Sequence, residues 1–265
     1  MNLKKLTSLL LKPYSSNKYT KDLFSVLYKV GLFGLYGDEW DFLRNGELRV
    51  MKMIANRHVE KAIIFDVGAN EGTYCEHLLN VFNHQQVSLL VYGFEPATDT
   101  YGRYSDRFKN NPKVITNNVG LSDRTQILRL YKSKISSGFA TLYKDNKFNF
   151  DASEDVAFTT LDEYSTTNKI DEIHFLKMDV EGHELAVLKG ATNLLDARRI
   201  KAIQFEFGAG NMSARTFFKD FYDLLTANYR IFRIVKNGLV PVDKYAYNME
   251  IFGRVTNYVA FLRPN

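Results

Sequence analysis

The sequence predicts an α/β fold, a doubly wound and mostly parallel sheet, from three observations. A short apolar run at residues 62–65 breaks into a turn with Gly68 and Gly72, and a helical pattern follows. A second such run, residues 88–94, ends in the acid Glu95. Strand and helix patterns then alternate along most of the chain, which is typical of parallel strands joined by helices. With 265 residues, 45% of them hydrophobic, the chain can bury one large core.

Seven segments have the pattern of core strands. They are residues 62–65, 88–94, 113–116, 173–178, 201–207, 229–235 and 257–262. Helical spacing marks residues 72–82, 184–195 and 214–228. The last two strands have no helix between or after them, so we expect a seven-stranded Rossmann-like sheet whose last strand is antiparallel.

Two regions depart from this alternation. Residues 1–60 form an N-terminal helical extension, with helical spacing over 19–28 and 38–55 and a break at Gly31–Gly34. We expect it to cap the sheet, cover the cofactor, form a homodimer or contact a membrane peripherally. In the main domain, residues 61–265, a β-rich insertion is expected at about residues 124–160, where apolar residues alternate.

Composition excludes several classes of protein. The one cysteine, Cys75, excludes a disulfide framework and favours a reducing, cytoplasmic location. No apolar stretch is long enough to span a bilayer, and the leucine run in residues 1–11 is followed by no small-residue cleavage site. These residues therefore predict an amphipathic helix. The net charge of +5 is modest and scattered, so it permits an anionic substrate without requiring one.

The glycine turn has a distinctive spacing. Asp66, Gly68, Asn70 and Gly72 alternate with other residues, and the third glycine of a dinucleotide-binding turn is absent. This pattern resembles the first motif of class I S-adenosylmethionine methyltransferases. The resemblance implies that all four residues bind the cofactor, whose cationic amino acid end suits a nearby carboxylate.

Glu95 is the second candidate site residue. It follows Gly72 by about 23 residues and ends a predicted parallel strand, where doubly wound folds place an acid against ribose hydroxyls. The alternative is a solvated carboxylate at a strand end. Nicotinamide enzymes share this feature, so only the spacing of the glycine turn separates them from methyltransferases.

The sequence Asp-Val-Glu-Gly-His-Glu at residues 179–184 is the third and most specific motif. With it, the chain resembles the FkbM family of S-adenosylmethionine-dependent methyltransferases. The resemblance covers about residues 60–210 and is carried by residues 65–72, 94–96, 118–123, 160–164, 177–184 and 188–191. It implies O-methylation, commonly of sugar hydroxyls in polysaccharides, glycolipids or glycosylated natural products.

O-methylation requires alignment of the methyl donor and removal of a hydroxyl proton. Our hypothesis is that His183 or Asp179 accepts this proton, and Asp179 can alternatively orient His183 or the methionine end of the cofactor. The structural alternatives are an N-cap role for Asp179 and a surface position in the first helical turn for His183.

A metal site is a further hypothesis. Asp179 and Glu206 end neighbouring predicted strands, and together with His183 they would suit a divalent cation such as Mg²⁺ that lowers the pKa of the hydroxyl. The alternative is a site without metal. Lys177 lies in a predicted buried strand, so we expect it to pair with a carboxylate such as Asp66 or Glu206.

The remaining polar candidates carry weaker signals. Asn118 and Asp123 follow the third strand, where related folds close over adenine, and a simple turn is the alternative reading. The other four histidines have no partners at meaningful spacing and are expected to be structural or superficial. They are His58, His77, His84 and His174.

The favoured function is thus an O-methyltransferase for a small-molecule or glycan acceptor. The alternatives are a non-catalytic or nucleic-acid-directed S-adenosylmethionine-binding protein and a nicotinamide-dependent oxidoreductase. No nucleic acid partner is expected, because the signatures of base methylation are absent and the charge forms no clear phosphate track.

Overall fold

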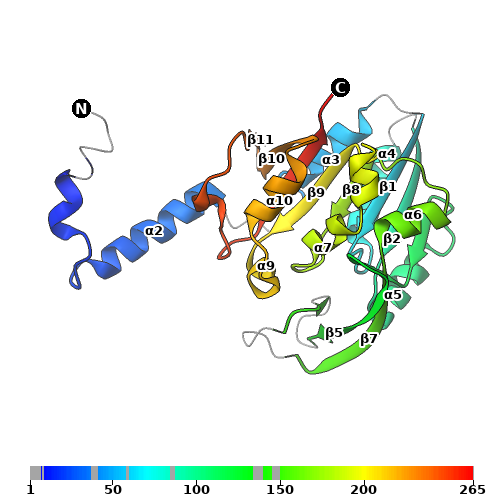
Figure 1. Ribbon diagram of the computed structural model, residues 1–265, viewed down its shortest axis with the longest axis horizontal. Coiled ribbons are helices and arrows are strands. Elements are labelled where there is room, and N and C mark those ends of the chain that lie inside the picture. Colours follow the sequence, from blue (N-terminus) through cyan, green and yellow to red (C-terminus); the bar gives the residue numbers. More distant parts are fainter. Residues whose placement is uncertain are drawn as a thin grey trace. The chain divides into compact units, whose positions relative to one another are not determined.

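The computed structural model describes residues 7, 9–36, 41–57, 60–83, 87–133, 140–144 and 150–264. They form two compact units, residues 1–39 and 40–265. The first unit contains a short 3-10 helix, η1 (Lys12–Tyr14), and the helix α2 (Lys21–Tyr36) (Figure 1). Its glycines Gly31 and Gly34, which were expected to break the helix, lie within α2, where added methyl groups would meet nothing.

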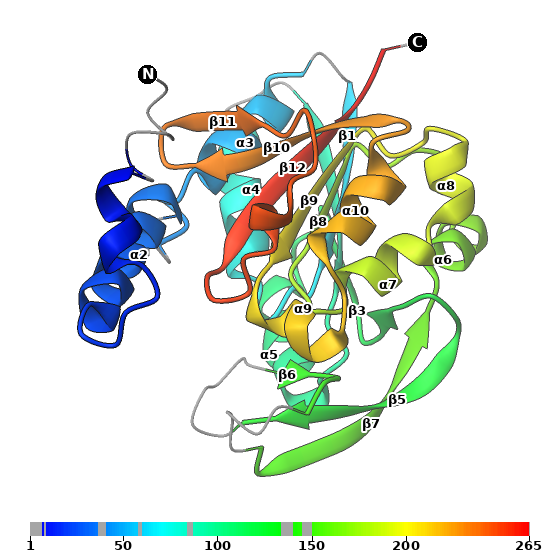
Figure 2. The same cartoon turned by 60° about the vertical axis from the view of Figure 1, so that its left-hand side comes forward.

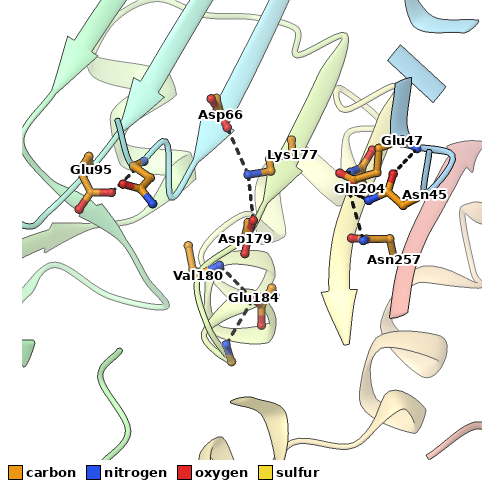
Figure 3. A network of polar contacts seen from close by, with 12 residues as sticks. Asn45, Glu47, Asp66, Glu95, Lys177, Asp179, Val180, Glu184, Gln204 and Asn257 are labelled. Atoms are coloured by element: carbon orange, nitrogen blue, oxygen red, sulfur yellow. Dashed lines mark hydrogen bonds and ion pairs between the residues drawn. The ribbon is translucent and has the colours of Figure 1, made fainter. Parts of the chain in front are cut away.

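The division between the units differs from the predicted boundary at residue 60. Helix α3 (Glu47–Ala55) buries Val50, Met51 and Ile54 in the core of the second unit. Glu47 also accepts hydrogen bonds from the side-chain amides of Gln204, at 2.6 Å, and Asn257, at 3.3 Å (Figure 3). Because α3 is held by both apolar and polar contacts, it belongs to the α/β domain.

The main sheet confirms the predicted α/β class. Its order is β11-β10-β12-β9-β8-β1-β2-β3. The strands are β1 (Lys61–Val67), β2 (Ser88–Phe94), β3 (Val114–Asn117), β8 (Phe175–Met178), β9 (Ala202–Phe207), β10 (Tyr229–Val235), β11 (Gly238–Pro241) and β12 (Thr256–Leu262). The five strands from β3 to β9 run parallel, and β12 is antiparallel to both of its neighbours.

Among the described residues, the main sheet has eight strands, one more than predicted. The additional strand, β11, forms an antiparallel hairpin with β10 at the edge of the sheet. It spans four residues, contains no fully buried residue and ends in Pro241, so its apolar run of Leu239 and Val240 is too short to mark a strand.

Helices cover both faces of the sheet (Figures 1 and 2). Besides α3, they are α4 (Thr73–Asn83), α5 (Thr98–Phe108), α6 (Leu161–Thr167), α7 (Glu184–Lys189), α8 (Thr192–Asp196), α9 (Ala209–Ala214) and α10 (Phe218–Leu225), with the 3-10 turn η2 (Tyr247–Met249). One hydrophobic cluster packs α3, α4 and α5 against the sheet, and a second packs α6, α7, α8 and α10. The helices leave the carboxyl ends of the parallel strands for a ligand site, which is where open α/β sheets bind their ligands.

Two predicted helices have different bounds in the structure. Residues 184–195 form α7 and α8, which are separated at Gly190, where an added Cβ would lie 2.0 Å from the carbonyl oxygen of Ser122. Residues 214–228 contain α10, which is separated from α9 by Arg215 in the left-handed region at φ 58°. Both breaks are tertiary features that helical spacing does not reveal.

The insertion is a four-stranded sheet of order β4-β7-β5-β6 (Figure 2). Its strands are β4 (Gly120–Leu121), β5 (Gln126–Lys132), β6 (Ala140–Thr141) and β7 (Ala152–Thr159). Leu130, Val156 and Phe158 form a small core together with Ala97, which follows β2. The insertion therefore packs at the exit of β2, beside the carboxyl ends of the parallel strands.

Within the described ranges, no helix combines the length and apolar character that crossing a lipid bilayer requires.

Candidate functional site

The glycine turn between β1 and α4 is set by contacts that exclude side chains. Gly68 adopts φ 78°, and a Cβ there would lie 1.9 Å from the carbonyl oxygen of Asp179. Gly72 adopts φ 84°, and its Cβ would lie 2.4 Å from the Phe108 ring. Gly68 therefore lets the exits of β1 and β8 touch, and Gly72 lets α5 pack beneath the turn.

Glu95 connects the exit of β2 to this turn. One carboxylate oxygen of Glu95 (Figure 3) accepts a hydrogen bond from the backbone N–H of Asn70 at 3.0 Å. The other accepts from Ala97 N–H at 2.9 Å. The residue is only 7% exposed, and this burial raises the pKa of Glu95 to about 7 although the two N–H groups lower it. A carboxylate has about four lone-pair directions, so acceptor capacity remains for a ligand.

These residues line a pocket at the carboxyl ends of β1, β2 and β8. It encloses about 780 Å³, including its mouth open to solvent. Its polar lining includes Gly68, Asn70, Glu95, Asp179, Glu181 and His183, and its apolar lining includes Pro96, Leu121, Leu130 and Phe158. This volume and mixture are typical of small-molecule and cofactor sites.

Lys177 lies beneath the pocket on β8. Its Nζ is 3.5 Å from Asp66 Oδ1 and 3.4 Å from Asp179 Oδ2 (Figure 3), and it lies 4.8 Å from the centre of the Tyr74 ring. Burial alone would lower the pKa of Lys177, but Asp179, Asp66 and Glu47 raise it overall. The predicted pairing of Lys177 with Asp66 is confirmed. Asp66 is fully buried and lies outside the pocket lining, so it acts on the site through Lys177.

Both ring nitrogens of His183 have protein partners. Nε2 lies 2.9 Å from Ser122 Oγ, and Nδ1 lies 2.7 Å from the hydroxyl of Tyr143. Ser122 donates its hydroxyl hydrogen to Asp123 Oδ1 at 3.1 Å, so it accepts from Nε2–H, and Nδ1 accepts from Tyr143. Burial lowers the pKa of His183 to about 4. The lone pair that a base would use is thus occupied by Tyr143.

Glu181 is the site residue that sequence reasoning missed. Its side chain lines the pocket and its backbone is left-handed, at φ 52°. The Thr141 hydroxyl donates to the Glu181 carbonyl oxygen at 3.1 Å, and Gly182 N–H donates to Glu184 Oε1 at 3.3 Å. Burial raises the pKa of Glu181 to about 8, and the charges of Asp179 and Glu184 contribute. The available sequence signal was an acid directly before a glycine at a strand exit.

The turn that carries Glu181 packs directly against the start of α9. Gly182 adopts φ 102°, and a Cβ there would lie 2.5 Å from the carbonyl oxygen of Gly210. A Cβ on Gly210 would lie 2.7 Å from the carbonyl carbon of Glu181. The loops that follow β8 and β9 therefore contact each other through backbone atoms, with no side chain between them.

Asn118, Asp123 and Gly72 lie outside the pocket lining. The side-chain amide of Asn118 donates to the carbonyl oxygens of Glu95 and Pro96, at 3.0 and 3.1 Å, and so supports the exit of β2. Asp123 accepts from Ser122 and pairs with Arg124 at 3.4 Å. Asn118 and Asp123 were predicted to contact adenine, but neither residue lines this pocket.

The other histidines have structural contacts where they are described. His77 stacks on Phe42, with ring centres 4.6 Å apart, and His174 Nδ1 accepts from Ile63 N–H at 3.1 Å. His58 and His84 lie outside the described residues.

The predicted Mg²⁺ site at Asp179 and Glu206 gains no support. Within the part of the chain that the structure describes, no group of three or more His, Cys, Asp or Glu side chains is arranged to hold a metal ion. Burial raises the pKa of Glu206 well above its ordinary value, and Asp179, Glu181 and Glu184 raise it further. Glu206 is therefore one of several carboxylates that lie close together beside the pocket.

The glycine-turn pocket lies at the carboxyl ends of the parallel strands, which is where open α/β sheets bind their ligands. Residues 66–231 match the methyltransferase FkbM domain model, which spans more than half of the chain. The chain belongs to this family. Membership sets aside the nicotinamide-dependent alternative.

One relative with a known name is also a methyltransferase. Hexuronic acid methyltransferase AglP of Haloferax volcanii is 29% identical over 167 residues, which is 62% of this chain and 64% of that protein. The match thus spans slightly less than two thirds of the relative.

Comparison with solved structures finds two proteins that are described as methyltransferases. The FkbM methyltransferase of Methylobacillus flagellatus has a TM-score of 0.48 and 16% identity, covering 77% of this chain and 44% of that one. A Streptococcus mutans methyltransferase in complex with SAH has a TM-score of 0.44 and 9% identity, covering 82% of this chain and 97% of that one.

Proposed function

We propose that the protein is an S-adenosylmethionine-dependent O-methyltransferase that acts on a hydroxyl of a sugar, a glycan or a glycosylated small molecule. The observation that carries this proposal is the convergence of Gly68, Asn70, Glu95 and Asp179 on one pocket. Family membership supports methyl transfer. The name of the Haloferax relative, a hexuronic acid methyltransferase, supports a sugar acceptor.

The pocket residues fit the parts of this cofactor. The unused acceptor capacity of Glu95 suits ribose hydroxyls, and the apolar side chains of Pro96, Leu121 and Phe158 suit a flat purine. The side chain of Asp179 is 44% exposed, so it can meet an ammonium group while it remains paired with Lys177. When bound, S-adenosylmethionine supplies a methyl group on an activated sulfonium.

The chain must then accept the proton of the acceptor hydroxyl. We assign this role to Glu181 in preference to His183, because the Nδ1 lone pair of His183 is occupied by Tyr143. Glu181 lines the pocket on a turn that is held by Thr141 and Glu184, and a pKa of about 8 is close to a working pH near neutrality. Asp179 orients the methionine end of the cofactor.

Calorimetric titration with S-adenosylhomocysteine tests the cofactor site. We expect micromolar binding by the natural protein and at least tenfold weaker binding by Glu95→Gln, about 1.4 kcal/mol, because the amide cannot accept from both backbone N–H groups. Asp171→Asn is the matched control, since its carboxylate lies at the surface with 94% exposure. Absence of binding by the folded natural protein, with or without Mg²⁺, would contradict the proposal.

The affinity should also depend on pH. With a pKa of about 7, Glu95 is ionised above pH 7 and becomes protonated below it. We therefore expect affinity for S-adenosylhomocysteine to fall about tenfold from pH 8 to pH 6, as expected when one group must lose a proton to bind. Glu95→Gln should show a flat profile, and a flat profile in the natural protein would remove Glu95 from ligand recognition.

The role of Glu181 is tested by turnover. Glu181→Gln should retain affinity for S-adenosylhomocysteine while methyl transfer to glycan acceptors falls about 100-fold or more, the usual contribution of a positioned base. Equal turnover in Glu181→Gln and the natural protein would exclude this role.

A further inference from the structure

Helix α2 is unusually apolar for a helix with no buried residue. Ten of its sixteen residues are aliphatic or aromatic, and none of the sixteen, all of which are described, is buried. Leu27 and Val30 are 53% and 63% exposed. The exposed apolar residues that precede the helix are Leu9, Leu10, Leu11, Tyr14 and Tyr19.

The polar residues of α2 occupy a narrow strip. At roughly 100° per residue, Lys21, Asp22, Ser25 and Lys29 fall within about 100° of the helix circumference. Most of the remaining surface is apolar, and the last turns are apolar on every side. Contiguous exposed apolar surface of this kind marks a site of interaction.

The charge of the N-terminal segment favours an anionic partner. Residues 1–36 contain six lysines and a single acid, Asp22, a net charge of +5. The rest of the chain, which begins with Gly37, Asp38 and Glu39, has 29 basic and 29 acidic residues and is neutral overall. The positive charge that looked scattered is therefore an excess held by the same segment that exposes the apolar helix.

We propose that residues 9–36 dock the protein on an anionic lipid surface, with α2 lying along the interface. Apolar side chains would enter the acyl boundary, lysines would extend to anionic headgroups, and tyrosines suit the level between them. Docking would bring the proposed methyltransferase site to acceptors carried on lipids. The inference rests on α2 and its charge and is independent of the cofactor pocket.

Co-sedimentation of the full-length protein with phosphatidylcholine vesicles, prepared with and without phosphatidylglycerol, tests this docking. We expect at least tenfold tighter binding to the anionic vesicles, weakened by high salt. Leu27→Glu combined with Val30→Glu should reduce this binding at least tenfold. Ile127→Glu is the matched control, because Ile127 is 73% exposed on the insertion sheet, and it should bind like the natural protein.

A second variant removes charge without altering the apolar surface. Lys21→Gln combined with Lys29→Gln should weaken binding to anionic vesicles and leave the weak binding to neutral vesicles unchanged. Every variant should retain its affinity for S-adenosylhomocysteine, which shows that it is folded and separates failure of docking from failure of the proposed enzyme.

Three other results would overturn the proposal. The first is that the natural protein does not bind anionic vesicles, and the second is that Ile127→Glu loses as much vesicle binding as the double variant of Leu27 and Val30. The third is that replacing Leu27 and Val30 converts a dimer to a monomer in sedimentation velocity while vesicle binding is unaffected. A second copy of the chain would then cover α2 in place of lipid.

Discussion

The two walls of the pocket are held together by different kinds of contact. We call Gly68, Asn70 and Glu95 the sheet wall. We call Thr141 and His183, together with Tyr143, which contacts His183, the insertion wall. In the sheet wall, the backbone of Gly68 packs against the backbone of Asp179. Glu95 accepts a hydrogen bond from Asn70 N–H, 25 residues earlier in the sequence. In the insertion wall, side-chain hydroxyls bridge 40 residues of sequence. The sheet wall is therefore determined by the backbone at the ends of the strands. The insertion wall is a hydrogen-bond network that a single side-chain substitution can break.

The largest expected effect comes from removing the charge beneath the sheet wall. Lys177→Met leaves the fully buried Asp66 without its ionic partner, so we expect about 3–5 kcal/mol of destabilisation in urea unfolding. Without Lys177, burial raises the pKa of Asp66 further, so Asp66 is protonated more readily in the folded state and the deficit should shrink as pH falls. Lys189→Met, at an exposed position, is the control, and unchanged stability of Lys177→Met would contradict the pairing.

A smaller effect is expected from a single methyl group in the glycine turn. Gly68→Ala places a Cβ 1.9 Å from Asp179 O at a positive φ, so we expect about 2–4 kcal/mol of destabilisation and loss of S-adenosylhomocysteine binding. Gly102→Ala in α5 is the matched control. An added Cβ there meets nothing within 4 Å, so it should be neutral or stabilising by about 1 kcal/mol. Equal behaviour of the two variants would show that the sheet wall tolerates side chains.

The insertion wall should be sensitive to acid. Unfolded His183 binds a proton near pH 6.5 and folded His183 only near pH 4, so its contribution is present above pH 6.5 and is lost as pH falls. We expect the stability advantage of the natural protein over His183→Gln to shrink by about 1–2 kcal/mol between pH 7 and pH 5. Urea unfolding at the two pH values measures this. An advantage that does not change with pH would mean that His183 is not held neutral by burial.

The smallest effect is expected from one hydroxyl of the insertion wall. Tyr143→Phe removes the donor to His183 Nδ1, and we expect about 1 kcal/mol of destabilisation with affinity for S-adenosylhomocysteine changed less than threefold. Tyr247→Phe is the control, since Tyr247 is exposed. A loss as large as that of Gly68→Ala would make the two walls equivalent.

The spacing of residues predicted the sheet wall because its residues lie at the ends of core strands. A strand, a positive-φ glycine and a strand-end acid determine where Gly68 and Glu95 lie once the strands are parallel. The same rule placed Asp179 at the shared edge. The short strand β11 was missed because its apolar run, Leu239 and Val240, is only two residues long and is followed by Pro241.

The insertion wall could not be predicted in the same way. Nothing in the local sequence indicates that Tyr143 would meet His183, because the contact depends on how the insertion sheet packs beside β2. The protonation of His183 and Glu181 follows from burial, which only tertiary structure determines. The hypothesis of His183 as a base rested on an ordinary histidine pKa.

The bare contact between Gly182 and Gly210 bears on how acceptor specificity could be re-engineered. Neither glycine has room for a Cβ, so the two loops fit only as a pair. Grafting the loop after β9 from a relative that lacks a residue equivalent to Gly210 would displace the backbone of Glu181. Chimeras that change the acceptor should therefore exchange the loops after β8 and β9 as one module.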